Sequence, residues 1–204
     1  MNVLAVFAHP DDEVLGAGGT LAKHAERGDD VATLLLVERG LESQARAATT
    51  LLGSTVAFRN YPDQALETVR LSDLANSLCL DPWEPDVIYT HHPGDLNLDH
   101  ALTARAVLTA FRPKPKEKPR TILACEVLSS TEWTFPQVFQ PNWFETLSVE
   151  QLLKKRDALA CYPSEVQEPP HPRSLWGIEN VAKTRGQQAG VAFAEAFQLL
   201  RRSC

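Results

Sequence analysis

A short segment near the start of the chain brings a histidine and three carboxylates together. His9 is followed by a proline and then by Asp11, Asp12 and Glu13. Ionisable side chains this close together are costly to hold unless a cation balances them. Imidazole nitrogen and carboxylate oxygen form a donor set that Zn²⁺ accepts well. A plain polar turn before a helix needs one capping residue rather than a cluster, so we interpret the segment as half of a metal site.

A second cluster of metal-ligating residue types lies at residues 91–100, which read His-His-Pro-Gly-Asp-Leu-Asn-Leu-Asp-His. In open α/β sheets, ligands bind at the edge formed by the carboxyl ends of the strands. Two clusters that each follow a strand are therefore expected to meet. His9, Asp12 and His100 would supply three ligands and leave one position for water, which is the arrangement of a catalytic zinc site. We predict one Zn²⁺ per chain on these residues.

The elements that position the clusters are visible as apolar runs. Residues 2–8 and 86–91 precede the two clusters and are predicted to be strands. Further strand patterns lie at 31–37, 54–59 and 121–128. Helical patterns lie at 15–27, 42–52, 67–80, 99–111, 149–161 and 178–202. This alternation predicts βαβ units with right-handed crossovers. We expect an α/β fold: a single-domain, Rossmann-like sandwich over residues 1–204, with a mostly parallel sheet flanked by helices.

Composition limits the class of partner. The chain has 204 residues, of which 44% are hydrophobic and 23% charged, and a net charge of −6. Nucleic-acid and membrane-surface binders need a basic face, so we expect neither kind of partner. The first residues carry no signal-peptide pattern, and no apolar run reaches transmembrane length. We expect a cytoplasmic protein without stable membrane insertion. The aromatic-rich stretch at 133–144 favours core or subunit interface, which keeps a homo-oligomer open.

The two clusters resemble the motifs of the LmbE-like (PIG-L) family of zinc-dependent N-deacetylases. The matching motifs are Ala-His-Pro-Asp-Asp-Glu at residues 8–13 and the Asp-His pair at 99–100. Gly-Ala-Gly-Gly at 16–19 also fits the opening of the family's first helix. The resemblance is sharp over roughly residues 1–110 and thin beyond.

The resemblance implies a reaction as well as a fold. It places the family's metal ligands on His9, Asp12 and His100 and its general base on Asp11. The family includes deacetylases of N-acetylglucosaminyl-phosphatidylinositol and of the mycothiol and bacillithiol pathways. We therefore expect zinc-dependent hydrolysis that removes an acetyl group from an N-acetylated amino sugar of the GlcNAc type, or from its glycoconjugate.

One position departs from the family pattern. Many members have His-Pro-Asp-His where this chain has Asn-Leu-Asp-His at 97–100, so the histidine that stabilises the oxyanion in those members is Asn97 here. An amide can donate a hydrogen bond to an oxyanion, but it carries no charge and no titratable proton. Two alternatives follow: Asn97 fills this catalytic role, or His92 reaches in from the same loop.

Two further carboxylates are expected to support the site from behind. Asp99 would orient a metal ligand or a loop amide. Glu13 has two equal interpretations, as a partner behind the metal ligands or as a carboxylate that interacts with the first turn of the following helix. Neither residue is expected to contact the substrate directly.

Two other parts of the sequence are candidates for contact with the substrate. Asp63 follows the third strand pattern and is expected to bind a sugar hydroxyl, with a turn aspartate as the alternative. Residues 162–177 show no period and hold four prolines, as functional loops over active sites often do. His171 and Arg173 lie in this segment and would meet a polar or anionic substrate group. A plain surface crossing is an equal alternative.

Two other function classes compete with a deacetylase. A metal-dependent phosphoesterase is conceivable because Asp95 and Asp99 add carboxylates, although two-metal sites need more ligands. A catalytically weak sugar- or nucleotide-binding Rossmann-like protein is suggested by the glycines at 16–19 and by Asn97. Those glycines do not form G-x-G-x-x-G, and the carboxylates before them would repel a pyrophosphate.

Overall fold

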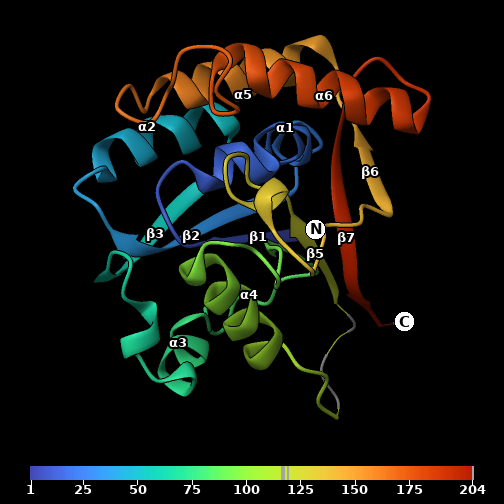
Figure 1. The fold of residues 1–204 in the computed structure, drawn as a ribbon. Helices are drawn as coiled ribbons and strands as arrows, with labels where there is room; N and C mark the ends of the chain where they lie inside the picture. Colours follow the sequence, from blue (N-terminus) through green and yellow to red (C-terminus); the bar gives the residue numbers. More distant parts are fainter. Residues whose placement is uncertain (116–117, 119, 204) are drawn as a thin grey trace.

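The computed structural model describes residues 1–115, 118 and 120–203, and a seven-stranded sheet lies at its centre (Figure 1). The strands are β1 (Asn2–Phe7), β2 (Asp30–Glu38), β3 (Thr55–Pro62), β4 (Val87–His91), β5 (Thr121–Cys125), β6 (Trp143–Thr146) and β7 (Ala194–Arg202). Their order in the sheet is β3-β2-β1-β4-β5-β7-β6. The pairings from β3 to β5 are parallel, and β7 runs antiparallel to both of its neighbours.

Helices cover both faces of this sheet (Figure 1). They are α1 (Asp12–Glu26), α2 (Glu42–Leu52), α3 (Leu71–Ser77), α4 (Leu98–Ala110), α5 (Val149–Ala160) and α6 (Leu175–Ala189), with short 3-10 helices η1 (Leu66–Thr68) and η2 (Thr131–Trp133). One face carries α1, α2, α5 and α6, and the other carries α3 and α4. The expected α/β sandwich with a mostly parallel sheet is confirmed. No helix within the described residues is long and apolar enough to cross a membrane.

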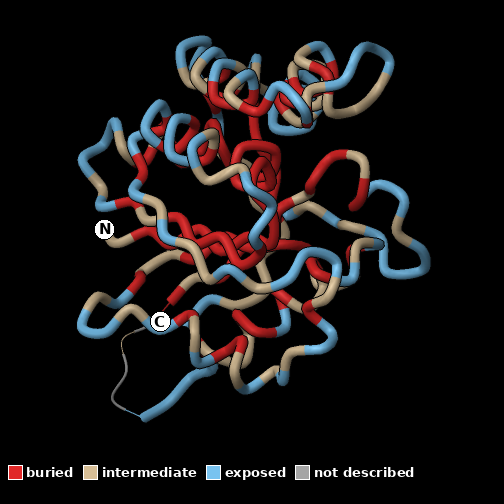
Figure 2. The backbone as a smooth tube through the Cα atoms, turned by 90° about the vertical axis from the view of Figure 1, so that its left-hand side faces the viewer, coloured by how far each residue is buried: buried red, intermediate tan, exposed pale blue. Residues whose placement is uncertain are grey.

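The continuous apolar run of β1 is explained by burial on both sides. Val3, Ala5 and Phe7 belong to the core beneath α1, whereas Leu4 and Val6 belong to the core beneath α4. Successive side chains of a strand point to opposite faces, so a central strand must be apolar at every position. Figure 2 shows that buried backbone gathers at the centre of the molecule.

Helix α1 lies unusually close to the strands beneath it. A Cβ placed on Gly16 would lie 2.9 Å from Phe7 Cε1 and 3.0 Å from Cys125 Cβ. Only glycine therefore permits this approach of α1 to β1 and β5. The glycines at 16–19 serve packing here, and they place the first turn of α1 at the end of β1.

The strand order creates a crevice between β1 and β4. From β1 the chain crosses to β2 on one side, while β4 pairs with the other side of β1. Ligands of open α/β sheets bind at such a switch point, outside the carboxyl ends of the strands. His9 follows β1, and residues 92–97 join β4 to α4. The two sequence clusters consequently lie at one edge of the sheet.

The prediction for the C-terminal region was wrong. Helix α6 ends at Ala189, where Gly190 adopts a left-handed conformation with φ 73°. Ala194–Arg202 is strand β7 rather than the second half of a helix over 178–202, and it pairs with β5 and β6. Residues Ala194 to Phe197 are all buried, so both faces of the strand are covered and no two-residue period is left in the sequence.

Candidate active site

A polar pocket of about 320 Å³ opens at the crevice between β1 and β4. Seven of the predicted site residues line it: His9, Asp11, Asp12, Asp63, Asn97, His100 and Arg173. Asp99 and Glu13 do not line it but contact residues that do, as expected of supporting groups. His92 and His171 are not among the lining residues.

Three donor atoms at the base of the pocket form a nearly equilateral triangle. His9 Nδ1 lies 3.1 Å from Asp12 Oδ2 and 3.2 Å from His100 Nε2, and the last two atoms are 3.2 Å apart. All three side chains are buried. Ligand atoms about 2.0–2.1 Å from a tetrahedral zinc ion would be separated by about 3.3–3.4 Å. The donor types and their spacing therefore fit a Zn²⁺ ion bound by three protein ligands.

Each histidine of this triangle is held from behind by a carboxylate. Asp99 Oδ2 lies 3.2 Å from His9 Nε2, and Asp95 Oδ1 lies 3.2 Å from His100 Nδ1. Histidines that bind metals commonly use their second ring nitrogen in this way, because the contact fixes the tautomer and the ring orientation. A second possible metal group combines His9 with Asp63 and Asp99. We favour the first triangle because all of its members are buried.

Both supporting aspartates are themselves fixed by hydrogen bonds. Asp99 accepts the backbone N–H groups of Gln64 at 2.9 Å and Leu66 at 3.1 Å. Asp95 accepts hydrogen bonds from the hydroxyls of Ser130 and Thr131. Asp99 was expected to orient a ligand or a loop amide, and in this geometry it contacts both, whereas the role of Asp95 was not predicted.

The electrostatic field at the triangle favours a cation. Burial disfavours the protonated form of His9, but hydrogen bonds and charges from Asp12 and Asp99 outweigh burial and raise its pKa to about 10. Burial likewise opposes protonation of His100, and Asp12 and Asp95 raise its pKa to about 9. Carboxylates that hold protons this firmly on the two rings will also stabilise a divalent ion in their place.

His91 is a further buried histidine that the sequence did not single out. Its Nε2 accepts the backbone N–H of Ala8 at 2.8 Å. Its ring stacks on the ring of His100, with centroids 3.9 Å apart. Burial lowers the pKa of His91 well below its usual value, and the nearby His100 adds to this. His91 therefore packs the His100 ring and ties the end of β1 to β4.

Asp11 has the backbone conformation of a constrained turn. Its φ of 110° lies in a region that non-glycine residues rarely occupy. The turn is fixed from both sides: the Asp11 N–H donates to Glu13 Oε2 at 3.0 Å, and its carbonyl accepts from Val14 N and Leu15 N, each at 3.0 Å. This turn leaves the Asp11 carboxylate in the pocket beside the donor triangle without being part of it.

The charge of Asp11 is balanced by an arginine from a distant segment. Burial and the neighbouring Asp12 raise the pKa of Asp11 well above its usual value. Arg173 opposes this shift, and its Nη1 lies 3.2 Å from Asp11 Oδ2. A buried carboxylate with a raised pKa, next to an arginine that favours its ionised form, is suited to accept and release a proton, as a hydrolytic general base must.

Glu13 supports the turn rather than the pocket. It is fully buried, and its Oε1 accepts a hydrogen bond of 2.6 Å from the Tyr162 hydroxyl. Burial raises the pKa of Glu13 to about 7, although the hydrogen bond from Tyr162 opposes that shift. Because the other oxygen of Glu13 holds the Asp11 N–H, this side chain links the turn to the segment that follows α5.

The structure distinguishes between the two candidates for the oxyanion donor. Asn97 lines the pocket and caps α4, with its Oδ1 accepting the Asp99 N–H at 2.9 Å. This bond leaves the Asn97 amide N–H groups available to a ligand. His92 instead turns away, with its Nε2 2.9 Å from the Gln137 carbonyl and its ring against Phe139. The alternative based on His92 is not supported.

A chain of ion pairs closes one side of the pocket. Arg39 lies 3.5 Å from Asp63 and 3.4 Å from Glu165. Glu165 in turn lies 3.3 Å from Arg173, which contacts Asp11. Four parts of the chain that are distant in sequence therefore meet at the mouth. Arg39 follows the β2 run, and the strand-end argument used for the other residues would have found it. Glu165 has no such sequence signal.

The irregular segment after α5 borders the pocket, as expected. The segment is shorter than the predicted 162–177, because α6 begins at Leu175. Only part of the expected contact is present: Arg173 reaches the pocket, whereas His171 Nδ1 accepts the backbone N–H of Arg173 at 3.1 Å. Gly177 lets this segment lie against α6, because a Cβ there would be 2.2 Å from the Pro172 carbonyl oxygen. His171 thus shapes the loop that carries Arg173.

The donor triangle with a buried carboxylate beside it fits a metal-dependent hydrolase, and the fold can hold such a site. The model of the PIG-L family, described as GlcNAc-PI de-N-acetylase, matches residues 4–111. That match spans both clusters and more than half of the chain, so the chain belongs to the PIG-L family. The family membership and the deacetylase class expected from the two motifs are confirmed.

Curated relatives match most of the chain. An uncharacterized deacetylase of Escherichia coli K12, YaiS, is 30% identical over 173 residues, which cover 76% of this chain and 89% of the relative. A probable N-acetyl-α-D-glucosaminyl L-malate deacetylase 2 of Bacillus anthracis is 26% identical over 187 residues, covering 80% of this chain and 81% of the relative.

Solved structures share the fold at lower identity. The N,N'-diacetylchitobiose deacetylase of Pyrococcus horikoshii superposes with a TM-score of 0.73 and 19% identity, covering 98% of this chain and 83% of that one. A 4-carboxy-2-hydroxymuconate hydratase of Pseudomonas putida has a TM-score of 0.75 and 23% identity, covering 100% and 97%. Since a hydratase shares the fold, the reaction must be argued from the family and the site.

Proposed function

We propose that the chain is a zinc-dependent N-deacetylase that removes the acetyl group from an N-acetylated amino sugar of the GlcNAc type or from its conjugate. One observation carries the proposal. Three buried donor atoms lie within 3.2 Å of one another, and the Asp11 carboxylate is beside them in the same pocket. A metal site with a separate carboxylate base suits the attack of water on an amide.

The proposed ligands are His9, Asp12 and His100, with one ion per chain. When bound, Zn²⁺ lowers the pKa of a water molecule and polarises the acetamide carbonyl. The two oriented imidazoles and one carboxylate match the mixed nitrogen and oxygen sets of catalytic zinc sites. Two-metal phosphoester chemistry is less well supported, because the second donor group in the described residues shares His9 with the first.

In this proposal Asp11 transfers the proton and Asn97 stabilises the negative charge that develops on the acetamide oxygen. Asp11 accepts a proton from water as the water oxygen bonds to the acetamide carbon. An N–H of the Asn97 side chain donates to the oxygen that becomes negative. Asp11 then passes the proton to the amine nitrogen as the carbon–nitrogen bond breaks. The products are acetate and the free amino sugar, and Asp11 returns to its ionised form.

Substrate selection is assigned to the mouth of the pocket. Asp63 and Arg39 face it from the ends of β3 and β2 and offer an acceptor and donors for sugar hydroxyls. The names of two relatives, an N-acetylglucosaminyl malate deacetylase and a diacetylchitobiose deacetylase, support an N-acetylglucosamine unit. A cytoplasmic location, a single domain and a homo-oligomer stay predictions.

Acetate release tests the proposal. Purified protein loaded with Zn²⁺ should release acetate from at least one member of a panel of N-acetylated monosaccharides, disaccharides and simple glycosides. The same protein treated with a chelator should release none and should recover on addition of Zn²⁺. Cleavage of phosphoesters without any acetate release would replace the proposal by the phosphoesterase alternative.

A further inference from the structure

A second hollow lies beside the candidate active site, at the surface of α6. This groove has a volume of about 450 Å³, within the range of sites for small molecules. Its apolar walls are Leu128, Pro170, Pro172, Trp176 and Val181. Trp176 is 56% exposed, so a large aromatic surface faces solvent at this point. Aromatic side chains in this position commonly mark a binding surface.

The groove adjoins the active-site pocket. Leu128 borders both hollows. Residues 126–132 form a shared wall, in which Ser129 faces the active site and Glu132 faces the groove. The segment 170–173 is divided in the same way, because its prolines line the groove while Arg173 lines the active site. A ligand with its acetamido group at the donor triangle therefore has this groove beside it.

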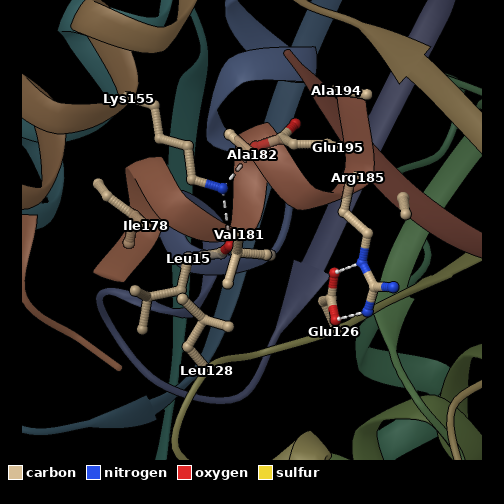
Figure 3. Close-up of a pocket in the computed structure, with 12 residues that line it drawn as sticks. Leu15, Glu126, Leu128, Lys155, Ile178, Val181, Ala182, Arg185, Ala194 and Glu195 are labelled. Atoms are coloured by element: carbon tan, nitrogen blue, oxygen red, sulfur yellow. Dashed lines mark hydrogen bonds and ion pairs between the residues drawn. The ribbon is translucent and has the colours of Figure 1, made fainter. Parts of the chain in front are cut away.

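The charged groups of the groove disfavour an anionic ligand. Arg185 donates to Glu126 through Nε at 2.7 Å and also through Nη2, as Figure 3 shows. Its remaining nitrogen, Nη1, donates to Gln188 at 2.9 Å. Glu132 accepts the backbone N–H of Ser129 at 2.7 Å. Every nitrogen of Arg185, the one cation among the described lining residues, thus has a partner, and two carboxylates against one guanidinium leave the groove negative.

We propose that the groove is an aglycone subsite. It binds an uncharged, apolar group, alkyl or aromatic, that is attached to the amino sugar whose acetamido group lies in the active site. This inference rests on the proposed deacetylase function. It narrows the substrate class from any N-acetylated amino sugar to a glycoside with an apolar aglycone, and it excludes glycosides whose aglycone ends in a carboxylate or phosphate.

Glycosides of one sugar provide the test. Methyl, hexyl and 5-carboxypentyl N-acetylglucosaminides, in both anomeric forms, are compared by acetate release from the zinc-loaded enzyme. Burial of most of the hexyl chain should raise kcat/KM for one anomer on the order of 10- to 100-fold over the methyl glycoside. The carboxypentyl glycoside should lose most of this gain, because its charge enters a negative groove.

Two variants link the effect to the groove. Trp176→Ala should reduce the hexyl-to-methyl ratio of kcat/KM at least fivefold. Leu51→Ala removes an apolar side chain of similar exposure from α2, outside the groove, and should leave the ratio unchanged. Binding is measured independently by tryptophan fluorescence of chelator-treated protein titrated with the hexyl N-acetylglucosaminide. The signal should be largely lost in Trp176→Phe.

The outcomes distinguish failure of the aglycone subsite from failure of the proposed deacetylase function. Acetate release with equal kcat/KM for methyl and hexyl glycosides would overturn the subsite and leave the deacetylase proposal intact. A preference for the carboxypentyl glycoside would also overturn it, as would a change of oligomeric state in Trp176→Ala, which would assign the groove to a second copy of the chain. No acetate from any glycoside would overturn both proposals.

Discussion

The guanidinium of Arg173 lies 3.2 Å from the carboxylate of Asp11, although 162 positions separate the two residues in the sequence. Asp11 belongs to the turn before α1, and Arg173 belongs to the segment before α6. The pair therefore joins the proposed general base to the segment that borders the mouth of the pocket. Displacement of that segment would change the charge environment of the base.

Loss of this arginine should impair turnover. In Arg173→Ala the guanidinium no longer favours the ionised form of Asp11, and we expect kcat to fall about 10- to 100-fold, less than the 10²–10⁴-fold of a lost acid–base group. Arg173→Lys should restore part of the rate. Steady-state kinetics at fixed metal content measure the effect. Arg156→Ala, which breaks an ion pair with Glu179, is the control. An effect on KM alone would show that Arg173 contacts only the substrate.

Substitution of two buried histidines tests the assignment of the metal ligands. His100→Ala removes one corner of the donor triangle, so bound zinc should fall from one equivalent to almost none. His92→Ala removes a ring that contacts Gln137 and Phe139 instead, so one equivalent should remain. Metal analysis after dialysis gives both numbers, and circular dichroism checks the fold. Equal zinc in the two variants would refute the assignment of His100.

The supporting carboxylates should tune metal affinity. Asp95→Asn leaves all three proposed ligands in place but weakens the contact that orients His100. We expect zinc affinity to fall about 10- to 100-fold, as is typical when such a partner is lost. Competition with a chromogenic chelator measures the dissociation constant. Asp73→Asn changes an exposed aspartate on α3 and should leave the affinity unchanged. An unaltered affinity in Asp95→Asn would mean that Asp95 is purely structural.

The capping contact of Asn97 and its proposed donor role are separable by substitution. Asn97→Asp retains an oxygen that can cap α4 but lacks the amide N–H groups, so kcat should fall about 10- to 10³-fold through loss of one oxyanion donor. Asn97→Ala should show the same kinetic loss and a further decrease of about 0.5–2 kcal/mol in unfolding free energy, because the cap is lost as well. Thermal denaturation and kinetics are compared for both. Full turnover in Asn97→Asp would exclude the donor role.

Sequence patterns predicted which candidate residues lie together where their placement depends on strand ends. The apolar runs before His9 and His91 identify β1 and β4, and neighbouring parallel strands must end at one edge. The topology of the sheet alone therefore predicts that His9, Asp12 and His100 lie close together. Asp95 was noted for its type, yet its role behind His100 depends on contacts with Ser130 and Thr131 that no spacing rule contains.

Other features depended on tertiary packing and could not be predicted. Asn97 is favoured over His92 because the His92 ring contacts the carbonyl of Gln137, which lies far along the chain. Glu165 meets two arginines only because of the path of the segment after α5. Strand β7 was mistaken for helix because burial on both faces removes the alternation that marks a strand.

One metal ion on His9, Asp12 and His100 is proposed to serve Asp11 in amide hydrolysis. The most direct test is acetate release from an accepted N-acetylated amino sugar while zinc is titrated into chelator-treated protein. We predict that the rate rises linearly and stops at one equivalent, and that Asp11→Asn binds the same single equivalent with a rate about 10²–10⁴-fold lower. Undiminished acetate release from zinc-loaded Asp11→Asn, or a rate independent of zinc, would contradict the account.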